Sequence, residues 1–202
     1  MKKLLFAAAA VFAFGMANAQ EDTKSFGFNE GDIILEGNLG FSSTNDKNTE
    51  EKTSSFNFNP KVGYFMSDKL AIGVELMVGS DKEEVAGTDT DKNSNIGAGA
   101  FARYYFLDLG QRFKTYGELG LGFNSGKAGL ADVKYSGIGA GVGLGVNYFV
   151  TEKIAINFAL TDILSYSTFK YDEGENVSQF NGNVNVFNNF FTTAQFGLTF
   201  KL

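Results

Sequence analysis

Five charged side chains lie in the middle of stretches that are otherwise apolar or rich in glycine. Such charges can do chemistry in two ways, because two carboxylic acids can transfer protons and opposite charges can form ion pairs. The chain has no His and no Cys, so it lacks the usual catalytic base, the commonest metal ligand and any thiolate. No two of its acids stand apart from a repeating pattern, and we predict that it is not an enzyme and holds no cofactor or metal. The five residues are Glu36, Lys61, Glu75, Arg103 and Glu118.

One acidic segment has the beginning of a calcium-binding loop. Residues 89–94 (DTDKNS) alternate acidic and other polar side chains, but the sixth position is Ser94 instead of glycine. The twelfth position, which supplies a bidentate carboxylate in such loops, is Ala100. We therefore interpret this segment as a solvated acidic loop.

A run of alternating glycines extends from Gly137 to Gly145. Its spacing is two throughout, and never the G-x-G-x-x-G spacing that opens a helix at a phosphate site. We interpret the run as one face of a strand, where glycine makes room for large side chains from opposite strands, with Phe101, Tyr105 and Tyr116 as candidates. A narrow groove for an acyl chain is the alternative interpretation.

The elements that position these residues read as alternating strands joined by short polar turns. Residues 61–76 form two such strands around Ser67, the pattern returns in residues 146–160, and a looser copy follows Arg103. Apolar and mixed positions alternate with a period of two, as in strands that are buried on one face. We expect eight antiparallel strands in an up-and-down meander, at residues 32–41, 56–65, 70–79, 96–105, 118–123, 137–148, 154–161 and 195–202.

The distribution of charge indicates which face of this meander points inward. All five mid-strand charges lie on the mixed face, and the apolar positions form unbroken rows. In a soluble barrel the apolar rows would surround a lipophilic ligand, whereas in a membrane barrel they face lipid. Rows that end in tyrosine favour the membrane, since tyrosine rings anchor at the level of the headgroups. The predicted aromatic girdle consists of Tyr64, Tyr104 and Tyr148.

The N-terminus indicates export. Lys2 and Lys3 precede an apolar stretch and the small-residue site Ala17-Asn18-Ala19, which is the pattern of a cleaved secretory signal. We expect residues 1–19 to be removed and residues 20–202 to form one domain, since no linker composition interrupts them. Without Lys2 and Lys3 the 17 basic residues become 15 against 23 acidic ones, a net charge of −8. Nucleic acid is therefore not an expected partner.

Two motifs carry a resemblance to a known family. The hairpin of residues 63–73 (Gly-Tyr-Phe, turn, Lys-Leu-Ala-Ile-Gly) and the strand end of residues 103–106 (Arg-Tyr-Tyr-Phe) resemble the small outer-membrane β-barrels of Gram-negative bacteria, of the OmpA transmembrane-domain and OmpX type. The resemblance implies an all-β, eight-stranded, antiparallel, up-and-down transmembrane β-barrel in the cell outer membrane, with a closed lumen filled by side chains.

In such a barrel the short turns face the periplasm and the long loops are extracellular. The resemblance places the short turns near Ser67, residues 108–112 and Thr151. The last long loop contains Asn181-Gly182, a hairpin signal. The four long loops are expected at residues 44–54, 80–94, 125–134 and 165–185.

Two functions fit this architecture. The first is a structural or surface-interaction role through the extracellular loops, carried out by a monomer. Its partners would be outer-membrane lipids and lipopolysaccharide, the barrel-assembly machinery during insertion, and a surface ligand that the sequence does not identify. The alternative is a small-solute or lipid-handling barrel that uses a glycine-lined interior groove.

Strand parity predicts which of the five charges meet, because facing positions of an antiparallel hairpin add up to a constant number. If Met66 faces Leu70 across the first short turn, Lys61 faces Glu75. We expect a belt of paired charges that plugs the lumen at mid-height, with a role in closure and register rather than in catalysis. Pairing Phe106 with Thr115 and Ser42 with Ser55 gives two further pairs, Arg103 with Glu118 and Glu36 with Lys61.

The hairpin of residues 146–160 is an internal control for this belt. Aligned with the first hairpin, it has Gly145 at the place of Lys61 and Ala159 at the place of Glu75. Both charges are lost together, as expected if they pair.

Two further expectations concern the ends and the interior of the strands. Lys201 and Asp32 are expected to pair near the periplasmic rim. Pro60 is the only proline and has no N–H for the ladder, so we expect a local bulge there.

Overall fold

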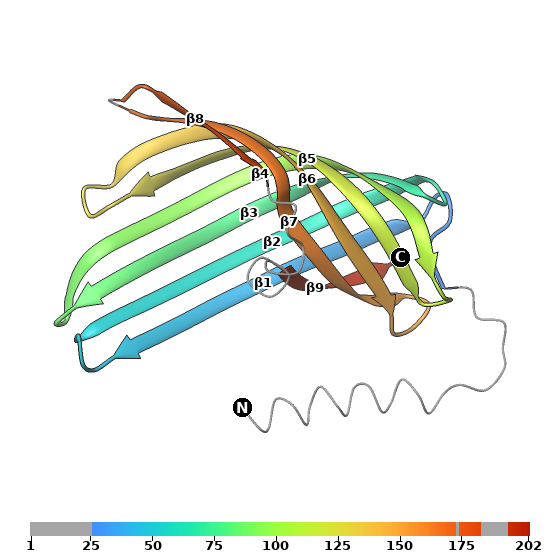
Figure 1. Ribbon diagram of the computed structural model, residues 1–202, viewed down its shortest axis with the longest axis horizontal. Coiled ribbons are helices and arrows are strands. Elements are labelled where there is room, and N and C mark those ends of the chain that lie inside the picture. Colours follow the sequence, from blue (N-terminus) through green and yellow to red (C-terminus); the bar gives the residue numbers. More distant parts are fainter. Residues whose placement is uncertain (1–25, 173, 183–193) are drawn as a thin grey trace.

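The computed structural model describes residues 26–172, 174–182 and 194–202. The predicted signal peptide, residues 1–19, lies outside these described residues. Within them, no helix is long and apolar enough to cross a membrane. The regular elements are the strands β1 (Ile33–Asp46), β2 (Glu51–Ser67), β3 (Leu70–Val85), β4 (Thr88–Leu109), β5 (Phe113–Ala128), β6 (Val133–Phe149), β7 (Ile154–Tyr171), β8 (Asn176–Gly182) and β9 (Ala194–Lys201) (Figure 1).

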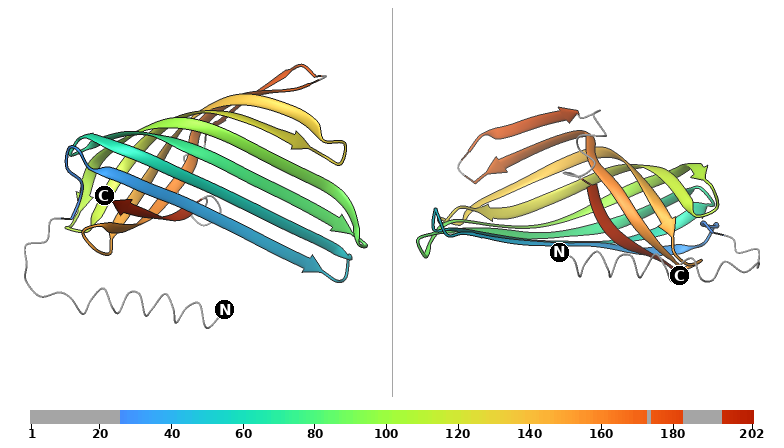
Figure 2. Two further views of the ribbon diagram at one scale, coloured as in Figure 1. Left: turned by 180° about the vertical axis from the view of Figure 1, so that it is seen from behind. Right: turned by 60° about the horizontal axis from the view of Figure 1, so that its bottom comes forward.

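Eight of these strands form a closed ring. Each strand from β1 to β7 pairs antiparallel with the next, and β9 pairs with β7 on one side and with β1 on the other. Strand β8 pairs with the part of β7 from Leu164 to Lys170 and, among the described residues, with no other strand. β8 lies along the outer half of β7, on the edge opposite β6 (Figure 2). The predicted eight-stranded antiparallel up-and-down barrel is confirmed, with β8 as an additional strand.

The apolar rows of the strands cover the outside of the ring. Val74 and Leu121, for example, are 62% and 59% exposed, whereas Glu36 and Arg103 on the opposite face are 2% and 1% exposed. A soluble barrel with an apolar interior would have the opposite arrangement. The alternative of a soluble barrel around a lipophilic ligand is therefore wrong, and the apolar band requires a lipid surrounding.

The two ends of the barrel differ in the length of their hairpins. At the short-turn end, the hydroxyl of Ser67 accepts hydrogen bonds from the backbone N–H groups of Lys69 and Leu70, at 3.4 and 3.2 Å. Thr151 accepts equivalent bonds from the N–H groups of the residues two and three positions later. The repeated hairpins thus share one turn type, in which a hydroxyl replaces a missing backbone acceptor.

The predicted outer segments are long, but most of their described residues continue as strands rather than as loops. β1 runs to Asp46 and β2 resumes at Glu51, and only residues 86 and 87 separate β3 from β4. The acidic segment of residues 89–94 lies within β4 rather than in a loop. Asn181 faces Ser165 inside the β7–β8 ladder, so the hairpin turns between Tyr171 and Asn176 and not at Asn181-Gly182. Ladder pairing satisfies the N–H and C=O groups of these polar segments, which favours continued strand over loop.

The short turns contain bulges that the parity argument did not include. Phe65 faces Ala71 but Ser67 faces Leu70, so Met66 is an extra residue and does not pair with Leu70 as predicted. In the second turn, Phe106 is extra for the same reason and does not face Thr115. A bulge increases the local twist where a strand enters a tight turn.

No bulge forms at Pro60, contrary to prediction. Pro60 faces Gly37 in regular register on the β1 side. On the β3 side the ladder omits Asn59 and Pro60, but the register is the same before and after them. The missing N–H is accommodated by a gap in the ladder, without a shift.

Candidate functional site: a charge belt and the cavity above it

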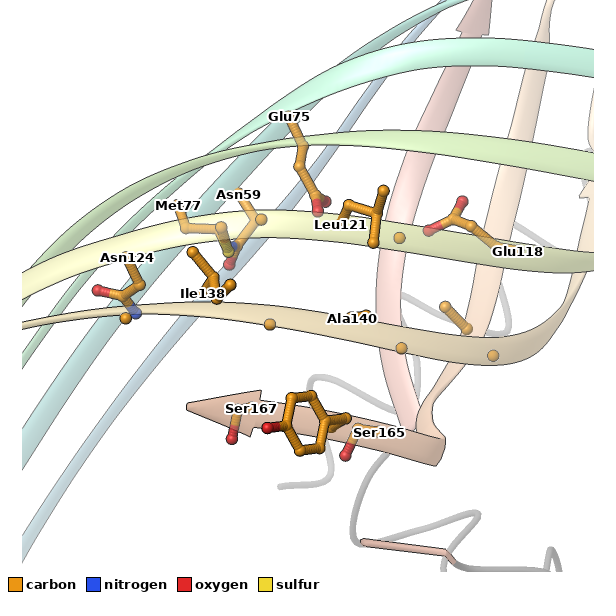
Figure 3. A pocket seen from close by; sticks show the side chains of 18 of the residues that line it. Asn59, Glu75, Met77, Glu118, Leu121, Asn124, Ile138, Ala140, Ser165 and Ser167 are labelled. Carbon is orange, nitrogen blue, oxygen red and sulfur yellow. The ribbon is translucent and has the colours of Figure 1, made fainter. Parts of the chain in front are cut away.

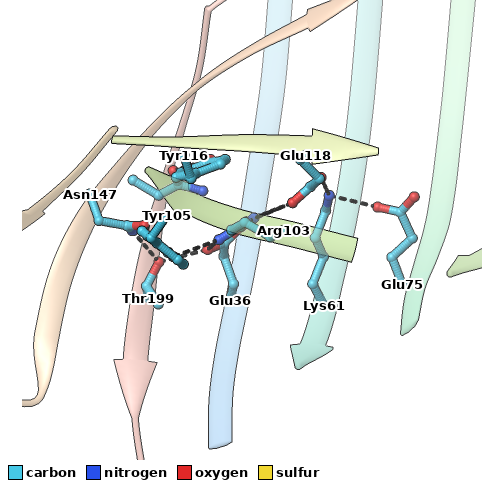
Figure 4. A network of polar contacts seen from close by, with 10 residues as sticks. Glu36, Lys61, Glu75, Arg103, Tyr105, Tyr116, Glu118, Asn147 and Thr199 are labelled. Atoms are coloured by element: carbon cyan, nitrogen blue, oxygen red, sulfur yellow. Dashed lines mark hydrogen bonds and ion pairs between the residues drawn. The ribbon is translucent and has the colours of Figure 1, made fainter. Parts of the chain in front are cut away.

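The five mid-strand charges form one chain of ion pairs across the lumen (Figure 4). Its registers agree with the parity argument, since Glu36 faces Lys61, Lys61 faces Glu75, and Arg103 faces Glu118. The Nζ of Lys61 lies 2.9 Å from Glu75 and 2.6 Å from Glu118. The Nε of Arg103 donates to the other Glu118 oxygen at 2.7 Å. Charge therefore alternates along the belt, from Glu75 at one end to Glu36 at the other.

The partner of Glu36 is Arg103 rather than Lys61, although Lys61 faces it in the ladder. Both oxygens of Glu36 accept from the Arg103 guanidinium, at 2.9 and 2.8 Å. This bidentate geometry is the preferred one for an arginine and a carboxylate. Arginine reaches across the lumen from β4, so facing positions in the ladder do not by themselves determine contacts inside a barrel.

A ring of neutral polar groups continues the belt toward the short-turn end. Thr199 donates to Glu36 at 2.7 Å and accepts from the amide of Asn147 at 3.0 Å. Asn147 in turn accepts from the hydroxyl of Tyr105 at 2.8 Å, and Tyr105 accepts from Arg103 at 3.4 Å. These residues are all buried. Their place in the site was not predicted. Asn147 and Thr199 nevertheless alternate with the apolar residues of their strands, as the five charges do, and this alternation could have placed them inside the barrel.

An aromatic cluster fills the lumen at the short-turn end. The ring of Phe28 stacks on Phe65 at 4.3 Å between centroids and contacts Tyr105 at 4.8 Å and Phe149 at 5.1 Å. The segment that carries Phe28 is fixed by a hydrogen bond from the N–H of Gly31 to the carbonyl of Phe65. We call this arrangement the aromatic cap. It was not predicted, because residues 26–32 precede the first strand and have no alternating pattern.

Two cations hold the same segment. The Lys201 ammonium donates to the carbonyl of Gly27 at 2.9 Å and lies 3.6 Å from Asp32, the pairing that was predicted near the rim. The Arg112 guanidinium lies over the ring of Phe26 at 4.4 Å. The aromatic cap is thus anchored from β9 and from the turn between β4 and β5.

On the other side of the belt lies a cavity of about 600 Å³ (Figure 3). The belt residues Lys61, Glu75 and Glu118 form its floor. Its wall includes Gly120, Gly122 and the alternating glycines from Gly137 to Gly143, together with hydroxyl groups of β7. The volume is in the range of ligand pockets. The groove that was kept as the alternative interpretation of the glycine run is therefore present as a cavity.

The inward glycines are of two kinds. A Cβ at Gly145 would lie 2.3 Å from the ring of Tyr116, so this glycine makes room for a ring as predicted. The ring of Phe101 packs on Gly73 instead of the predicted run, since a Cβ at Gly73 would lie 2.6 Å from it. A Cβ at Gly120 would have no atom within 4 Å, and at Gly139 it would have ordinary contacts only. Glycines of the second kind leave space unfilled.

Alanine substitution should separate these two kinds of glycine. Tyr116 is 1% exposed and donates to Asn157 at 2.7 Å, so it cannot move away from a new methyl group. Gly145→Ala should therefore lower the free energy of unfolding by about 1 to 3 kcal/mol through overpacking. Gly120→Ala should be neutral or stabilising by up to about 1 kcal/mol, because alanine restricts the unfolded chain. Urea unfolding of both variants in lipid vesicles measures the difference, and equal effects would contradict the distinction.

The tyrosines of the predicted girdle lie on the outer surface at the short-turn end. Tyr64 and Tyr104 are about half exposed. Tyr148 is less exposed, because its ring packs on Phe113 at 4.7 Å. Their role at the headgroups stays a prediction.

Charged side chains connect the outer hairpins. Lys82 lies 2.7 Å from Glu84 and 2.9 Å from Asp89, and Lys52 lies 3.5 Å from Glu84. The hydrogen bond from Lys82 holds the pKa of Glu84 below its ordinary value. Exposed pairs of this kind contribute little to stability. In the described residues no cluster of three or more His, Cys, Asp or Glu residues is arranged to hold a metal ion.

Comparison with known proteins agrees with this architecture. Residues 6–201 match the family described as outer membrane protein beta-barrel domain. Among solved structures the chain is similar to the outer membrane protein OprG from Pseudomonas aeruginosa, with 15% identity over 87% of this chain and 98% of that one and a TM-score of 0.53. That likeness supports the fold alone.

Two other solved structures are similar at lower scores. Neisserial surface protein A has 19% identity over 85% of this chain and 96% of that one, with a TM-score of 0.46. Escherichia coli outer membrane protein W has 18% identity over 86% and 99%, with a TM-score of 0.43. No curated protein sequence matches the chain. The family match covers nearly the whole chain, which therefore belongs to the outer membrane protein β-barrel domain family and is a transmembrane barrel of the cell outer membrane.

Proposed function

We propose that this chain is a sealed, non-conducting barrel with a structural or surface-interaction role, exerted through the hairpins that it extends outside the membrane. The observation that carries the proposal is the presence of two successive obstructions in the lumen, the charge belt and the aromatic cap. Both consist of buried side chains that are bonded to several strands. A barrel of eight strands is narrow enough for such side chains to fill its cross-section.

The length of the strands supports a role at the surface. A transmembrane strand needs about 9 to 11 residues, whereas β4 has 22 and β2 has 17. The outward apolar row of β1 ends at Phe41, and the five residues that follow it within the strand are polar. The excess length therefore projects from the outer end as polar hairpins, which are available to a ligand or to neighbouring lipopolysaccharide.

The other expected partners follow from the same architecture. Outer-membrane lipids and lipopolysaccharide would surround the apolar band, and the barrel-assembly machinery would act during insertion. The belt acids are engaged in ion pairs, and the chain has no His or Cys, which supports a protein without enzymatic activity. We propose that it acts as a monomer, since the ring of eight strands closes within one chain.

Bilayer recordings test the sealed lumen. The purified barrel, reconstituted in a planar bilayer, should give no sustained ohmic conductance, because ions would have to cross both the belt and the cap. A porin of 16 strands, inserted under the same conditions, serves as the positive control. Stable single-channel steps from this chain would show that the obstructions move, and the proposed function would then be wrong.

The cavity favours a second function, the binding of a small solute or lipid inside the barrel. Its volume of about 600 Å³ lies on the outer side of the belt, where the wall is made of glycine. Mass spectrometry of the barrel, released from native membranes in a mild detergent, should detect a co-purified small molecule or lipid. Loss of that molecule in a variant whose cavity is filled would link it to the interior.

A further inference from the structure

The floor of the cavity carries more negative than positive charge. Three carboxylates, Glu36, Glu75 and Glu118, stand against two cations, Lys61 and Arg103. Within the described residues, no further cation forms an ion pair with the belt. A charge inside a barrel is stabilised by water much less than at the surface, so one excess negative charge favours the binding of a cation.

The free position on the belt is on Glu75. Both oxygens of Glu36 bind Arg103, and each oxygen of Glu118 binds one of the two cations. In Glu75, Oε2 lies 2.9 Å from Nζ of Lys61, whereas Oε1 accepts no hydrogen bond from the described residues. The side chain lies across the bare backbone of Gly99, 2.9 Å from where a Cβ would be. Figure 3 shows its carboxylate reaching into the cavity.

The cations of the belt are more fully occupied than Glu75. Each nitrogen of Arg103 already donates to a carboxylate, and the ammonium of Lys61 binds two carboxylates. Among the charged groups at the floor of the cavity, the carboxylate of Glu75 therefore favours a ligand with a cationic donor.

We propose that the cavity binds a small protonated primary amine, with its ammonium group on Oε1 of Glu75 and its body against Met77 and the glycine wall. A metal ion is the poorer occupant, since one free carboxylate does not provide the several oxygen ligands that hard cations require. A primary ammonium has three N–H donors and no acceptor, which suits a carboxylate oxygen without a hydrogen-bond partner. This inference rests on the second function proposed above, binding inside the barrel.

Calorimetric titration with three probes of similar size tests the charge of the ligand. Benzylamine is cationic at pH 7, benzyl alcohol is neutral and benzoate is anionic. With the barrel in a neutral maltoside detergent, benzylamine should bind saturably at one molecule per chain. Benzyl alcohol should bind at least about tenfold more weakly, since a charge-assisted hydrogen bond is lost, and benzoate should not bind.

Three variants locate the site. Glu75→Gln should weaken benzylamine binding by about tenfold or more, because it removes the negative charge while keeping the shape. Gly120→Leu should abolish binding, since its side chain enters space in which a Cβ meets no atom within 4 Å. Gly37→Leu is the matched control: a Cβ there also meets nothing, but the position lies on the outward face beside Leu35. It should bind benzylamine like the unmodified chain.

The possible failures are distinguishable. If all three probes bind alike and Glu75→Gln has no effect, the amine site is wrong but interior binding stands. If no probe binds, both the amine site and interior binding of such molecules are rejected, while the sealed lumen is judged separately by conductance. If Gly37→Leu weakens binding as much as Gly120→Leu, the probe binds outside the cavity and the proposal is overturned.

Discussion

Replacing Arg103 with methionine should lower the free energy of unfolding by about 3 to 5 kcal/mol, the usual cost of removing one member of a buried ion pair. Arg103 is 1% exposed and its partner Glu36 is 2% exposed, so the carboxylate would remain buried without its bidentate partner. Arg103 also lies 4.0 Å over the ring of Tyr116, a cation–π contact that methionine cannot make. Urea titration in lipid vesicles measures the loss.

A double-mutant cycle identifies the origin of this cost. Glu36→Leu alone should also destabilise, and the double variant with Arg103→Met should recover a large part of the sum, because neither charge is then left alone. Strict additivity would show that the two residues do not act as a pair.

The pair of Lys61 and Glu75 provides a graded comparison. Its side chains are 15% and 16% exposed to the cavity, so the effects of Lys61→Met and Glu75→Leu should be smaller than that of Arg103→Met. Lys61 binds two carboxylates and Glu75 binds one cation, so Lys61→Met should cost more than Glu75→Leu. The opposite order would indicate that Glu75 has a partner that the belt does not include.

The register of the belt was predictable because a strand has a period of two. Facing positions keep a constant sum along a pair of strands until a bulge changes it, and Lys61 and Glu75 were placed correctly although the turn pairing of Met66 was wrong. At the turn, Leu70 faces Ser67, one residue away from the assumed partner Met66. The bulge at Met66 lies between the turn and the belt and shifts the register by one residue, so the assumed register holds at the belt. Contacts were less predictable, since the long side chain of Arg103 selects its partner across the lumen rather than along the ladder.

The cavity and the outer hairpins were harder to predict from the sequence, for a different reason. A glycine on the inward face can accommodate a ring or leave space empty, and only the three-dimensional position of Tyr116 distinguishes Gly145 from Gly120. The polar outer segments have no apolar alternation, so the sequence pattern favoured loops. Their strands are nevertheless held by the hydrogen bonds of the ladder.

Phe28 was missed because it lies outside any strand, but its removal should have an effect close to that of removing Arg103. Phe28→Ala should lower the free energy of unfolding by about 3 to 5 kcal/mol, the usual range for truncating a buried phenylalanine. The ring is 8% exposed and is in contact with Phe65, Tyr105 and Phe149, which would face the space it leaves. Urea unfolding in vesicles measures this loss.

Phe26 provides the matched control within the same segment. Its ring is only partly buried and makes a single ring–ring contact, at 6.3 Å from Phe149, besides the cation of Arg112. Phe26→Ala should therefore cost about 1 kcal/mol or slightly more, well below the cost at Phe28. Neither variant should conduct ions, because the charge belt remains intact above the cap. Equal destabilisation by the two substitutions would show that residues 26–32 dock as a unit, whereas conductance of Phe28→Ala would show that the cap, and not the belt, seals the barrel.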